Sequence, residues 1–346
     1  MQQQDDSLLP VQPGRDTLNL FPIPSSNGAS LTMKIFVTGA SGNIGKVLTK
    51  ELLSHGHQVL ALARSDASVA LLQNLGAEIQ RGTLNDLDIL RKAASECDGV
   101  AHLGFIHDFN DYAGCCAVDR AAIEAIGSSL AAAGDHRAFV ITSGTSLLKK
   151  GQLATEDQTY DENDPFGAFR GPSEPVALAF AERGVRVSVM RLPSVYGEGS
   201  LGWVAPMIAS AQEKQVVTYI GEGENRWCAT HTFDIARAYR LALEKGPAGS
   251  VFHAVAEEGV RAKDVALALG RKLNLPVVSK TREEAEEVYG LLANAIGIDN
   301  PSSSAKTRSQ LGWHPIHPPL LEYLGSGDWM ASTDLPSWSH AQDTNV

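Results

Sequence analysis

Three glycines at three-residue spacing follow a short apolar segment near the start of the chain. The segment covers residues 34–38, and Gly39, Gly42 and Gly45 come directly after it. The first glycine allows a tight turn, the second lets the main chain approach a phosphate, and the third lets the following helix pack against the strand. Unpaired N–H groups at the start of that helix can point at a bound anion. The pattern predicts a dinucleotide-binding turn; a glycine-bearing turn without a ligand is the alternative.

The end of the next apolar segment indicates which dinucleotide would bind. Arg64 and Ser65 follow residues 58–63, and no carboxylate comes before Asp66. An acidic side chain here would accept hydrogen bonds from the adenosine ribose, whereas a cation suits a 2′-phosphate. Arg64 can form charge-assisted hydrogen bonds to phosphate, and Ser65 can add a donor. We therefore expect NADP(H) to be favoured over NAD(H); a solvated surface arginine is the alternative.

Short apolar segments and amphipathic segments alternate from residue 33 onward. Strands are expected at residues 34–38, 58–63, 77–80, 99–103, 137–142 and 185–191. Helices are expected at residues 43–55, 66–75, 86–95, 114–133 and 173–183. This alternation predicts an α/β fold, a Rossmann-type doubly wound parallel sheet with helices on both faces.

The alternation loosens after residue 192, which suggests a change of domain. A helix at 233–245 and a strand at 251–255 are expected next, and further helices at 261–273, 281–291 and 302–311. We expect a dinucleotide-binding Rossmann domain over residues 33–192 and a smaller C-terminal substrate-binding lobe over residues 193–325. Residues 230–255 of that lobe are expected to return to the Rossmann domain.

Both ends of the chain are polar in composition. Residues 1–32 have neither a basic start nor an apolar stretch of signal-peptide length. We expect them to be a disordered leader or a gene-model extension, with Met33 as a candidate natural start. Residues 326–346 are expected to form a tail.

The overall composition narrows the range of partners. The formal net charge is −11 and no large basic cluster occurs, so no nucleic-acid partner is expected. No apolar run approaches the ~18 residues needed to span a membrane. The four cysteines show no metal-ligand spacing, so we expect no metal and a reducing, cytoplasmic location. The small-residue helix around residues 117–133 could form a homodimer face, with core packing as the alternative.

Five motifs in order resemble an extended short-chain dehydrogenase/reductase of the NAD-dependent epimerase/dehydratase type. These motifs are the glycine turn at 38–45, AHLG at 101–104, RLPSVYG at 191–197, HTFDIARA at 231–238 and LGWHP at 311–315. The resemblance covers about residues 33–320. It implies a small-molecule substrate and cofactor contacts from Gly39, Ser41, Gly42, Asn43, Ile44, Gly45, Arg64, Ser65, Leu84, Leu103, Gly104, Ser143, Pro193 and Val195.

The chain departs from that family where the catalytic pair is expected. The family uses a Tyr as proton donor and a Lys four residues later, which lowers the pKa of the tyrosine. Here Arg170 stands at the Tyr position and Glu174 at the Lys position. Gly144 falls at the usual Ser position, with Ser143 and Thr145 on either side.

Arg170 and Glu174 suggest a different chemistry. An arginine is a poor proton donor at neutral pH, but it can hold a carboxylate or stabilise an oxyanion. Glu174 can act as a base if burial raises its pKa. An Arg170–Glu174 helix pair, worth only about 0.3–0.5 kcal/mol, is the alternative.

Other side chains could supply the proton or hold a carbonyl group. His107 follows the fourth strand by a few residues, and a histidine is a better proton shuttle than an arginine. Thr145 could donate a hydrogen bond to a carbonyl oxygen. A surface position for His107 is the alternative.

Aromatic residues indicate what the substrate site holds. Those expected to border the cleft are Phe105, Phe169, Tyr196, Trp203 and Trp227. An aromatic lining suits a partly apolar carbonyl compound better than a nucleotide sugar, while core packing is the alternative for each residue.

Three functions are compatible with this pattern. The first is an NADP(H)-dependent oxidoreductase acting on a small-molecule carbonyl or alcohol, such as a specialised metabolite. The second is a redox-neutral isomerase, cyclase or dehydratase that uses the same pocket. The third is a non-catalytic regulatory protein that senses NADP(H).

Overall fold

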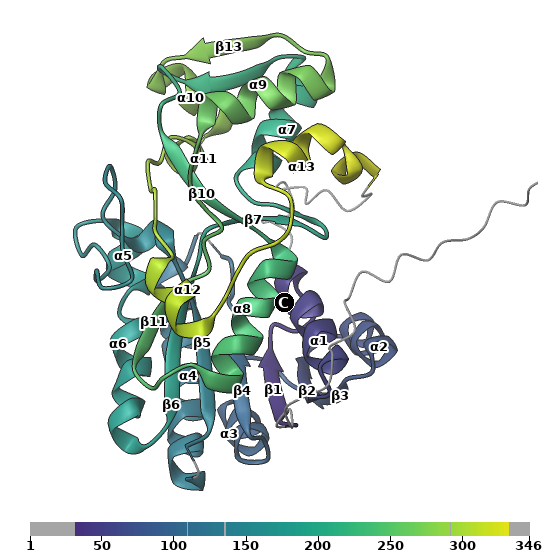
Figure 1. Ribbon diagram of the computed structural model, residues 1–346, viewed down its shortest axis with the longest axis vertical. Helices are drawn as coiled ribbons and strands as arrows, with labels where there is room; N and C mark the ends of the chain where they lie inside the picture. Colours follow the sequence, from purple (N-terminus) through teal and green to yellow (C-terminus); the bar gives the residue numbers. More distant parts are fainter. Residues whose placement is uncertain (1–31, 109, 135, 291, 332–346) are drawn as a thin grey trace, which may run out of the picture. The chain divides into compact units, whose positions relative to one another are not determined.

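The computed structural model describes residues 32–108, 110–134, 136–290 and 292–331 (Figure 1). The expected leader, apart from Thr32, and the expected tail from residue 332 lie outside the described residues. Trp329, within the expected tail, is buried in a short 3-10 turn at Asp328–Ala331.

A seven-stranded parallel sheet forms the centre of the fold (Figure 1). Its strands are β1 (Lys34–Thr38), β2 (Gln58–Ala63), β3 (Glu78–Arg81), β4 (Gly99–His102), β5 (Ala138–Gly144), β6 (Arg186–Leu192) and β11 (Ser250–His253). They lie in the order β11-β6-β5-β4-β1-β2-β3. This order confirms the expected doubly wound Rossmann-type sheet. Successive strands are added outward from β1 on one side and from β4 on the other, so the strand order reverses between β1 and β4.

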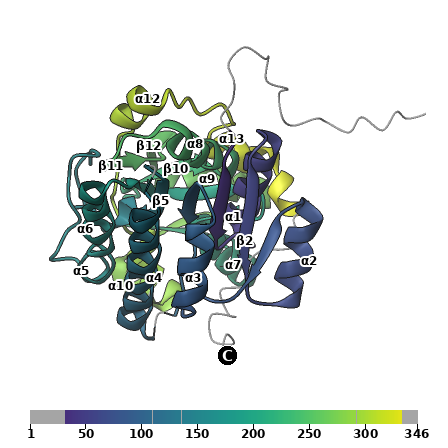
Figure 2. The same cartoon turned by 90° about the horizontal axis from the view of Figure 1, so that it is seen from below.

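Helices cover both faces of the sheet (Figure 2). One face carries α1 (Asn43–Ser54), α2 (Asp66–Leu75) and α8 (Thr232–Lys245), and the other carries α3 (Leu87–Ser95), α4 (Tyr112–Ala133) and α6 (Ser173–Leu178). In β1, Ile35 and Val37 pack into the first of these cores, whereas Phe36 packs into the second. β1 is therefore apolar on both sides, as expected for a central strand of a sheet covered on both faces.

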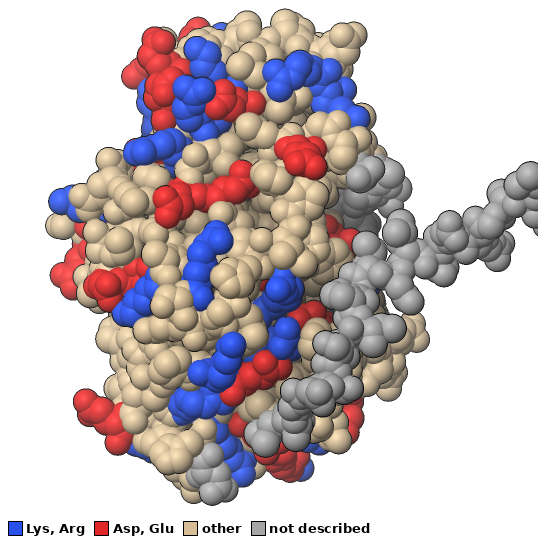
Figure 3. Space-filling model, viewed as in Figure 1, with Lys and Arg blue, Asp and Glu red and all other residues tan. Residues whose placement is uncertain are grey.

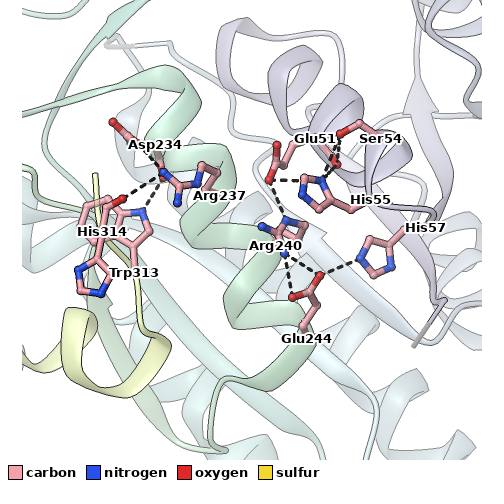
Figure 4. Close-up of polar contacts among 10 residues, drawn as sticks. All are labelled: Glu51, Ser54, His55, His57, Asp234, Arg237, Arg240, Glu244, Trp313 and His314. Carbon is pink, nitrogen blue, oxygen red and sulfur yellow. Dashed lines mark hydrogen bonds and ion pairs between the residues drawn. The ribbon is translucent and has the colours of Figure 1, made fainter. Parts of the chain in front are cut away.

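Ionic contacts fasten α8 to α1 (Figure 4). Arg240 donates to Glu51 at 2.7 Å and to Glu244 at 2.9 and 3.0 Å, and Glu244 also lies 3.1 Å from His57 Nε2. Near the other end of α8, the Trp313 indole donates to the carbonyl of Asp234. The later part of the chain thus packs directly onto the helix that follows the glycine turn.

The segments between β6 and α8, and after β11, form two small sheets and most of the remaining helices. The first small sheet contains β7 (Ser194–Gly197), β8 (Ser200–Leu201), β10 (Arg226–His231) and β12 (Glu257–Arg261); the second pairs β9 (Val217–Ile220) with β13 (Val277–Lys280). The helices are α7 (Val204–Lys214), α9 (Ala262–Leu273), α10 (Arg282–Tyr289), α11 (Leu292–Ile296), α12 (Ala305–Leu311) and α13 (Leu320–Ser326). A separate apolar core centred on Trp227 joins several of these elements.

The charged side chains on one face are of both signs. In Figure 3, basic and acidic residues lie interspersed between uncharged areas. Among the described residues, no helix is both long and apolar enough to cross a bilayer, and no cluster of His, Cys, Asp or Glu is placed to hold a metal ion.

Candidate functional site

The glycine turn is held by contacts that admit no side chain. Gly39 has φ +66°, and a Cβ on it would lie 2.7 Å from the backbone nitrogen of Gly104. A Cβ on Gly45 would lie 2.1 Å from the carbonyl oxygen of Gly39. Both distances are far below van der Waals contact, so the close approaches of β1 to β4 and of the turn to α1 require glycine.

The start of α1 is available to an anion. Gly42, its N-cap, is exposed, and no side chain caps the first turn. Ser41 and Ile44 are partly buried beside it, and Asn43 is exposed. An uncapped, exposed helix N-terminus carries unpaired N–H groups and a partial positive charge, which together favour a phosphate. The residues present therefore fit a dinucleotide pyrophosphate.

The end of β4 lies against this turn. The Gly104 amide donates to Thr38 Oγ1 at 3.0 Å, and the Leu103 amide donates to the Thr38 carbonyl at 3.3 Å. A Cβ on Gly104 would lie 3.1 Å from Leu84 Cδ2. The structure thus brings together Leu84, Leu103 and Gly104, which the sequence had assigned to the cofactor.

At the end of β2, Asp66 has an ion-pair partner among the described residues and Arg64 has none. Arg64 is exposed and forms no hydrogen bond or ion pair with the described residues. Asp66 pairs instead with Arg81 of β3. Ser65 caps α2, because its Oγ accepts from the Ser68 amide at 3.2 Å. The only unpaired charge at this strand end, among the described residues, is therefore positive.

Arg170 lies where β4 and β5 end. It closes α5 (Pro165–Arg170), and its guanidinium donates to the Thr142 carbonyl at 3.1 Å. The guanidinium carbon lies 3.6 Å from the centroid of the Phe105 ring, which is a close cation–π contact. Arg170 thus occupies the edge of the sheet at which ligands bind in folds of this type.

Glu174 is not available as a base. It is buried in α6, where its carboxylate accepts from Arg191 Nε at 2.9 Å and Nη2 at 2.6 Å. Ser143 Oγ also donates to it, at 2.6 Å. The expected Arg170–Glu174 helix pair does not form, because the helix breaks between α5 and α6. Ser143, assigned to the cofactor, thus directs its hydroxyl into the interior.

Thr145 is also turned inward. It is buried, and its hydroxyl donates to the Leu192 carbonyl at 3.2 Å and lies 3.2 Å from Cys228 Sγ. Asn300 donates to the same hydroxyl at 3.4 Å. Thr145 therefore joins β5 to β6 and β10 instead of presenting its hydroxyl to a carbonyl group. Burial raises the pKa of Cys228 to about 11, so this thiol is not a nucleophile.

His107 belongs to an aromatic cluster around Arg170. Its ring lies 5.1 Å from that of Phe105, edge to face, and Tyr112 contacts Phe105 and Phe166 in the same manner. His107 is exposed, yet contact with surrounding protein partly desolvates it, and this desolvation together with the Arg170 charge lowers its pKa. A neutral imidazole at pH 7 can accept a proton from an alcohol.

The remaining aromatic candidates divide into two groups. Phe169 is exposed and contacts the Tyr112 ring, so it stays with the Arg170 cluster. Trp227 and Tyr196 are core residues: the indole donates to the Ile296 carbonyl, and the phenol donates to the Pro318 carbonyl. Trp203 is partly buried and packs on the same core. Core packing, the alternative given for each aromatic residue, therefore describes Trp227 and Tyr196 in this structure.

Pro193 and Val195 follow β6, at the same sheet edge as Gly144. Pro193 is partly exposed and Val195 packs in the α1-side core. Gly199, in the turn between β7 and β8, would place a Cβ 3.5 Å from Lys46 Nζ and 3.9 Å from Asn43 Oδ1. This turn therefore lies against the first turn of α1.

A buried polar chain beneath the site was missed from the sequence. His102 Nδ1 lies 2.8 Å from Thr38 Oγ1, and His102 Nε2 lies 3.3 Å from Asp119 Oδ1. Ser173 Oγ donates to the other oxygen of Asp119 at 2.7 Å. The sequence feature that could have indicated this chain is Asp119, an acidic residue among small and apolar residues of the expected helix at 114–133. The chain connects the glycine turn, through α4, to the start of α6.

These features define an NAD(P)-binding enzyme of the short-chain dehydrogenase/reductase type: a parallel Rossmann sheet, a glycine turn at the first strand and a cluster of polar and aromatic residues where β4 and β5 end. The family model for the NAD-dependent epimerase/dehydratase family matches residues 35–254, and the chain belongs to this family. The family and the dehydrogenases and reductases among the relatives show an NAD(P)-dependent enzyme of oxidoreductase type.

Known proteins resemble the chain along most of its length. An uncharacterized protein of Schizosaccharomyces pombe is 44% identical over 296 residues, which cover 85% of this chain and 99% of that protein. A protein of Dictyostelium discoideum, named sterol-4-alpha-carboxylate 3-dehydrogenase (decarboxylating), is 28% identical over 239 residues. These residues cover 66% of this chain and 72% of that protein. The fold is that of DesIV, a dTDP-glucose 4,6-dehydratase from Streptomyces venezuelae with NAD and TYD bound; the TM-score is 0.71 at 18% identity, over 87% of this chain and 98% of that one.

Proposed function

We propose that this protein is an NADP(H)-dependent oxidoreductase that interconverts a small-molecule ketone or aldehyde and the corresponding alcohol. The observation that carries the cofactor preference is the exposed Arg64 at the end of β2, unpaired among the described residues, beside an Asp66 already paired with Arg81. A cation at this position can bind the 2′-phosphate that distinguishes NADP(H) from NAD(H).

The oxidoreductase assignment is supported by the position of Arg170 and His107 and by a relative. The Dictyostelium protein is named as a 3-dehydrogenase, so its name describes alcohol oxidation. A bound nicotinamide would supply the hydride chemistry, taking a hydride from the alcohol carbon or giving one to the carbonyl carbon. His107 takes the hydroxyl proton in oxidation and returns one proton to oxygen in reduction. Arg170 supplies the fixed positive charge beside it.

This chemistry proceeds without the tyrosine and lysine usual for the family. Arg170 holds the tyrosine position and Glu174 the lysine position, and Glu174 is neutralised by Arg191 in the interior. We infer that positioning by Arg170 and proton transfer by His107 replace the usual pair.

Dissociation constants for NADPH and NADH test the cofactor preference. Arg64→Ala is expected to weaken NADPH binding about tenfold to hundredfold, which corresponds to a charge-assisted hydrogen bond of about 1.5–3 kcal/mol. NADH binding should change little. Arg91→Ala, which removes an exposed arginine paired with Asp88, is the matched control. A ratio of the two constants that Arg64→Ala leaves unchanged would exclude Arg64 as the selector.

Absorbance at 340 nm with a panel of ketones, aldehydes and alcohols tests the reaction. Consumption of NADPH, or its formation from NADP+, is the expected result. Conversion of a substrate without net change in the cofactor would instead indicate an isomerase or dehydratase. Nucleotide binding with no conversion of any kind would favour a regulatory binder.

A further inference from the structure

No described carboxylate lies within ion-pair distance of the Arg170 guanidinium. Its one hydrogen bond to the described residues goes to the neutral carbonyl of Thr142, and it forms no ion pair with them. The Asp119 carboxylate attracts Arg170 electrostatically but is not within ion-pair distance of it, and its two oxygens accept from His102 and Ser173. The guanidinium is therefore held in place while most of its N–H donors stay uncommitted within the described part of the chain.

A partly buried guanidinium that contacts no carboxylate among the described residues gains free energy when a ligand supplies one. Arg170 is partly buried, since the Phe105 ring covers one face of the guanidinium. Withdrawal of a charge from water costs free energy that an opposite charge can offset. The planar guanidinium edge matches a carboxylate in shape and can donate two parallel hydrogen bonds to it.

The surroundings of Arg170 suit the apolar part of such a ligand. Ile106 is 38% exposed, and Phe166 and Phe169 are each 47% exposed, which is high for large apolar side chains. The Tyr112 ring contacts Phe166, Phe169 and also Phe105, on which Arg170 stacks, so the two exposed phenylalanines lie in one patch beside Arg170. Exposed apolar side chains that cluster in this way commonly mark a ligand site.

His107 lies within reach of the same ligand. Its ring and the Arg170 guanidinium both contact the Phe105 ring, at centroid distances of 5.1 and 3.6 Å. One small molecule can therefore place an anionic group on Arg170 and an oxygen at His107. A molecule in which a carbonyl group lies close to a carboxylate can make both contacts at once.

We propose that the substrate is an oxo acid with an apolar body, or the hydroxy acid formed from it, whose carboxylate binds Arg170. This inference rests on the proposed oxidoreductase function. In reduction, the carbonyl carbon receives the hydride of NADPH, the oxygen receives one proton through His107, and the products are the hydroxy acid and NADP+. The carboxylate is unchanged, and its contact with Arg170 selects and orients the substrate.

The full-length protein and matched pairs of compounds test this substrate class. Aryl-substituted 2-oxo and 3-oxo acids and their methyl esters are compared by kcat/KM, with NADPH saturating. The wild-type protein should prefer the acid of each pair. Arg170→Met should lower kcat/KM for the acids about tenfold to hundredfold more than for the matched esters, and should therefore abolish the preference. Arg170→Lys should restore part of it.

A matched arginine controls for lost cation–π packing. Arg183 stacks on Phe180, at 4.8 Å from the ring centroid, away from the strand ends that carry Arg170. Arg183→Met should keep the preference for acids. An equal loss on acid and ester in Arg170→Met, or a wild-type protein indifferent to the carboxylate, would overturn the proposal.

A binding measurement separates this inference from the proposed function. With NADP+ present, 4-phenylbutanoate should bind the wild-type protein more tightly than its methyl ester, and Arg170→Met should remove the difference. Reduction of neutral ketones without any preference for a carboxylate would support the proposed oxidoreductase function and overturn the oxo-acid substrate. Tighter binding of the carboxylate without turnover of any compound would overturn the proposed oxidoreductase function but support carboxylate binding at Arg170.

Discussion

At the scale of single residues, the main correction concerns Glu174. From the sequence it was a candidate base or the helix partner of Arg170, and in the structure it forms a buried two-point ion pair with Arg191. The spacing rules for helices could not reveal this pair, because the partners lie on α6 and β6 and meet only after the sheet has formed. Gly45 was accessible from sequence because the contact that requires it, with the Gly39 carbonyl, lies within the same turn.

The pair makes a strong prediction for stability. Glu174→Gln keeps the size of the side chain but leaves the Arg191 charge buried without a counter-ion. Loss of one partner of a buried ion pair costs about 3–5 kcal/mol. We expect the free energy of unfolding, measured by urea titration, to fall by about this amount.

An exposed pair provides the control for that measurement. Asp88→Asn removes the partner of Arg91 at the surface of α3, where such pairs contribute about 0–1 kcal/mol. A loss in Glu174→Gln no larger than that in Asp88→Asn would contradict the role given to the buried pair.

At the scale of elements, periodicity predicted the Rossmann part closely. After residue 192 it predicted the helices α8, α9, α10 and α12 and the strand β11, but it missed several other elements. The strand at Lys34–Thr38, the strand at Gln58–Ala63 and the helix at Asp66–Leu75 have the bounds expected from sequence. Each is a regular element with one or two fully apolar sides. By contrast, α7 and the strands at Val217–Ile220 and Arg226–His231 were not anticipated. They are short, and their apolar residues are used in a core formed by distant segments.

The long helix expected at 173–183 shows how local sequence can mislead. Its apolar pattern continues to residue 183, but α6 ends at Leu178 and a 3-10 turn, Ala179–Arg183, follows. The burial of Phe180 against Gly127 of α4 satisfies the same pattern with a different backbone. Packing across elements therefore decided where the helix ended.

The junction between the glycine turn and α1 gives a prediction at this scale. Gly45→Ala would place a methyl group 2.1 Å from the Gly39 carbonyl oxygen, so the turn must shift away from α1. Overpacking of this kind costs about 1–3 kcal/mol, and the displaced N–H groups no longer meet a phosphate. We expect NADPH binding, measured by fluorescence titration, to weaken at least tenfold.

The control for Gly45→Ala is Gly325→Ala in α13. A Cβ at Gly325 meets no atom within 4 Å. This change should leave nucleotide binding and thermal stability as in the wild-type protein. Normal NADPH binding by Gly45→Ala would show that the turn tolerates the displacement and does not hold the pyrophosphate.

At the scale of the whole molecule, buried histidines set the response to acid. Burial and the Arg191 charge lower the pKa of His253 to about 4, and burial and His317 lower that of His231 to about 4 as well. The unfolded chain, with an ordinary pKa near 6.5, binds more protons than the folded chain between these two values. Stability contributed by the neutral histidines is complete above pH 6.5 and is lost as the pH falls toward 4.

His253 is a better residue for a test than His231, because the hydrogen-bond partners of its two ring nitrogens define its tautomer. Arg191 donates to its Nε2 at 3.3 Å, and its Nδ1 lies 2.8 Å from the Ser303 carbonyl, so Nδ1 carries the hydrogen. Protonation of Nε2 would place a second cation against Arg191. We expect the free energy of unfolding to fall by up to about 3 kcal/mol for this residue between pH 6.5 and 4.

His253→Gln should make that pH dependence shallower, although the protein is destabilised at neutral pH. The slope of the free energy of unfolding against pH, from urea titrations between pH 4 and 7, is the quantity to compare. The same slope in the variant and the wild-type protein would show that His253 does not remain neutral in the folded state.

The buried pair of Glu174 and Arg191 also constrains any redesign of this enzyme. Two substitutions, Arg170→Tyr and Glu174→Lys, would restore the catalytic sequence usual for the family. The second, however, would set an ammonium group against the Arg191 guanidinium in the interior, where two like charges cannot be accommodated. Chemistry of the type usual for the family therefore requires a third change on β6, and the three positions must be altered as a single unit.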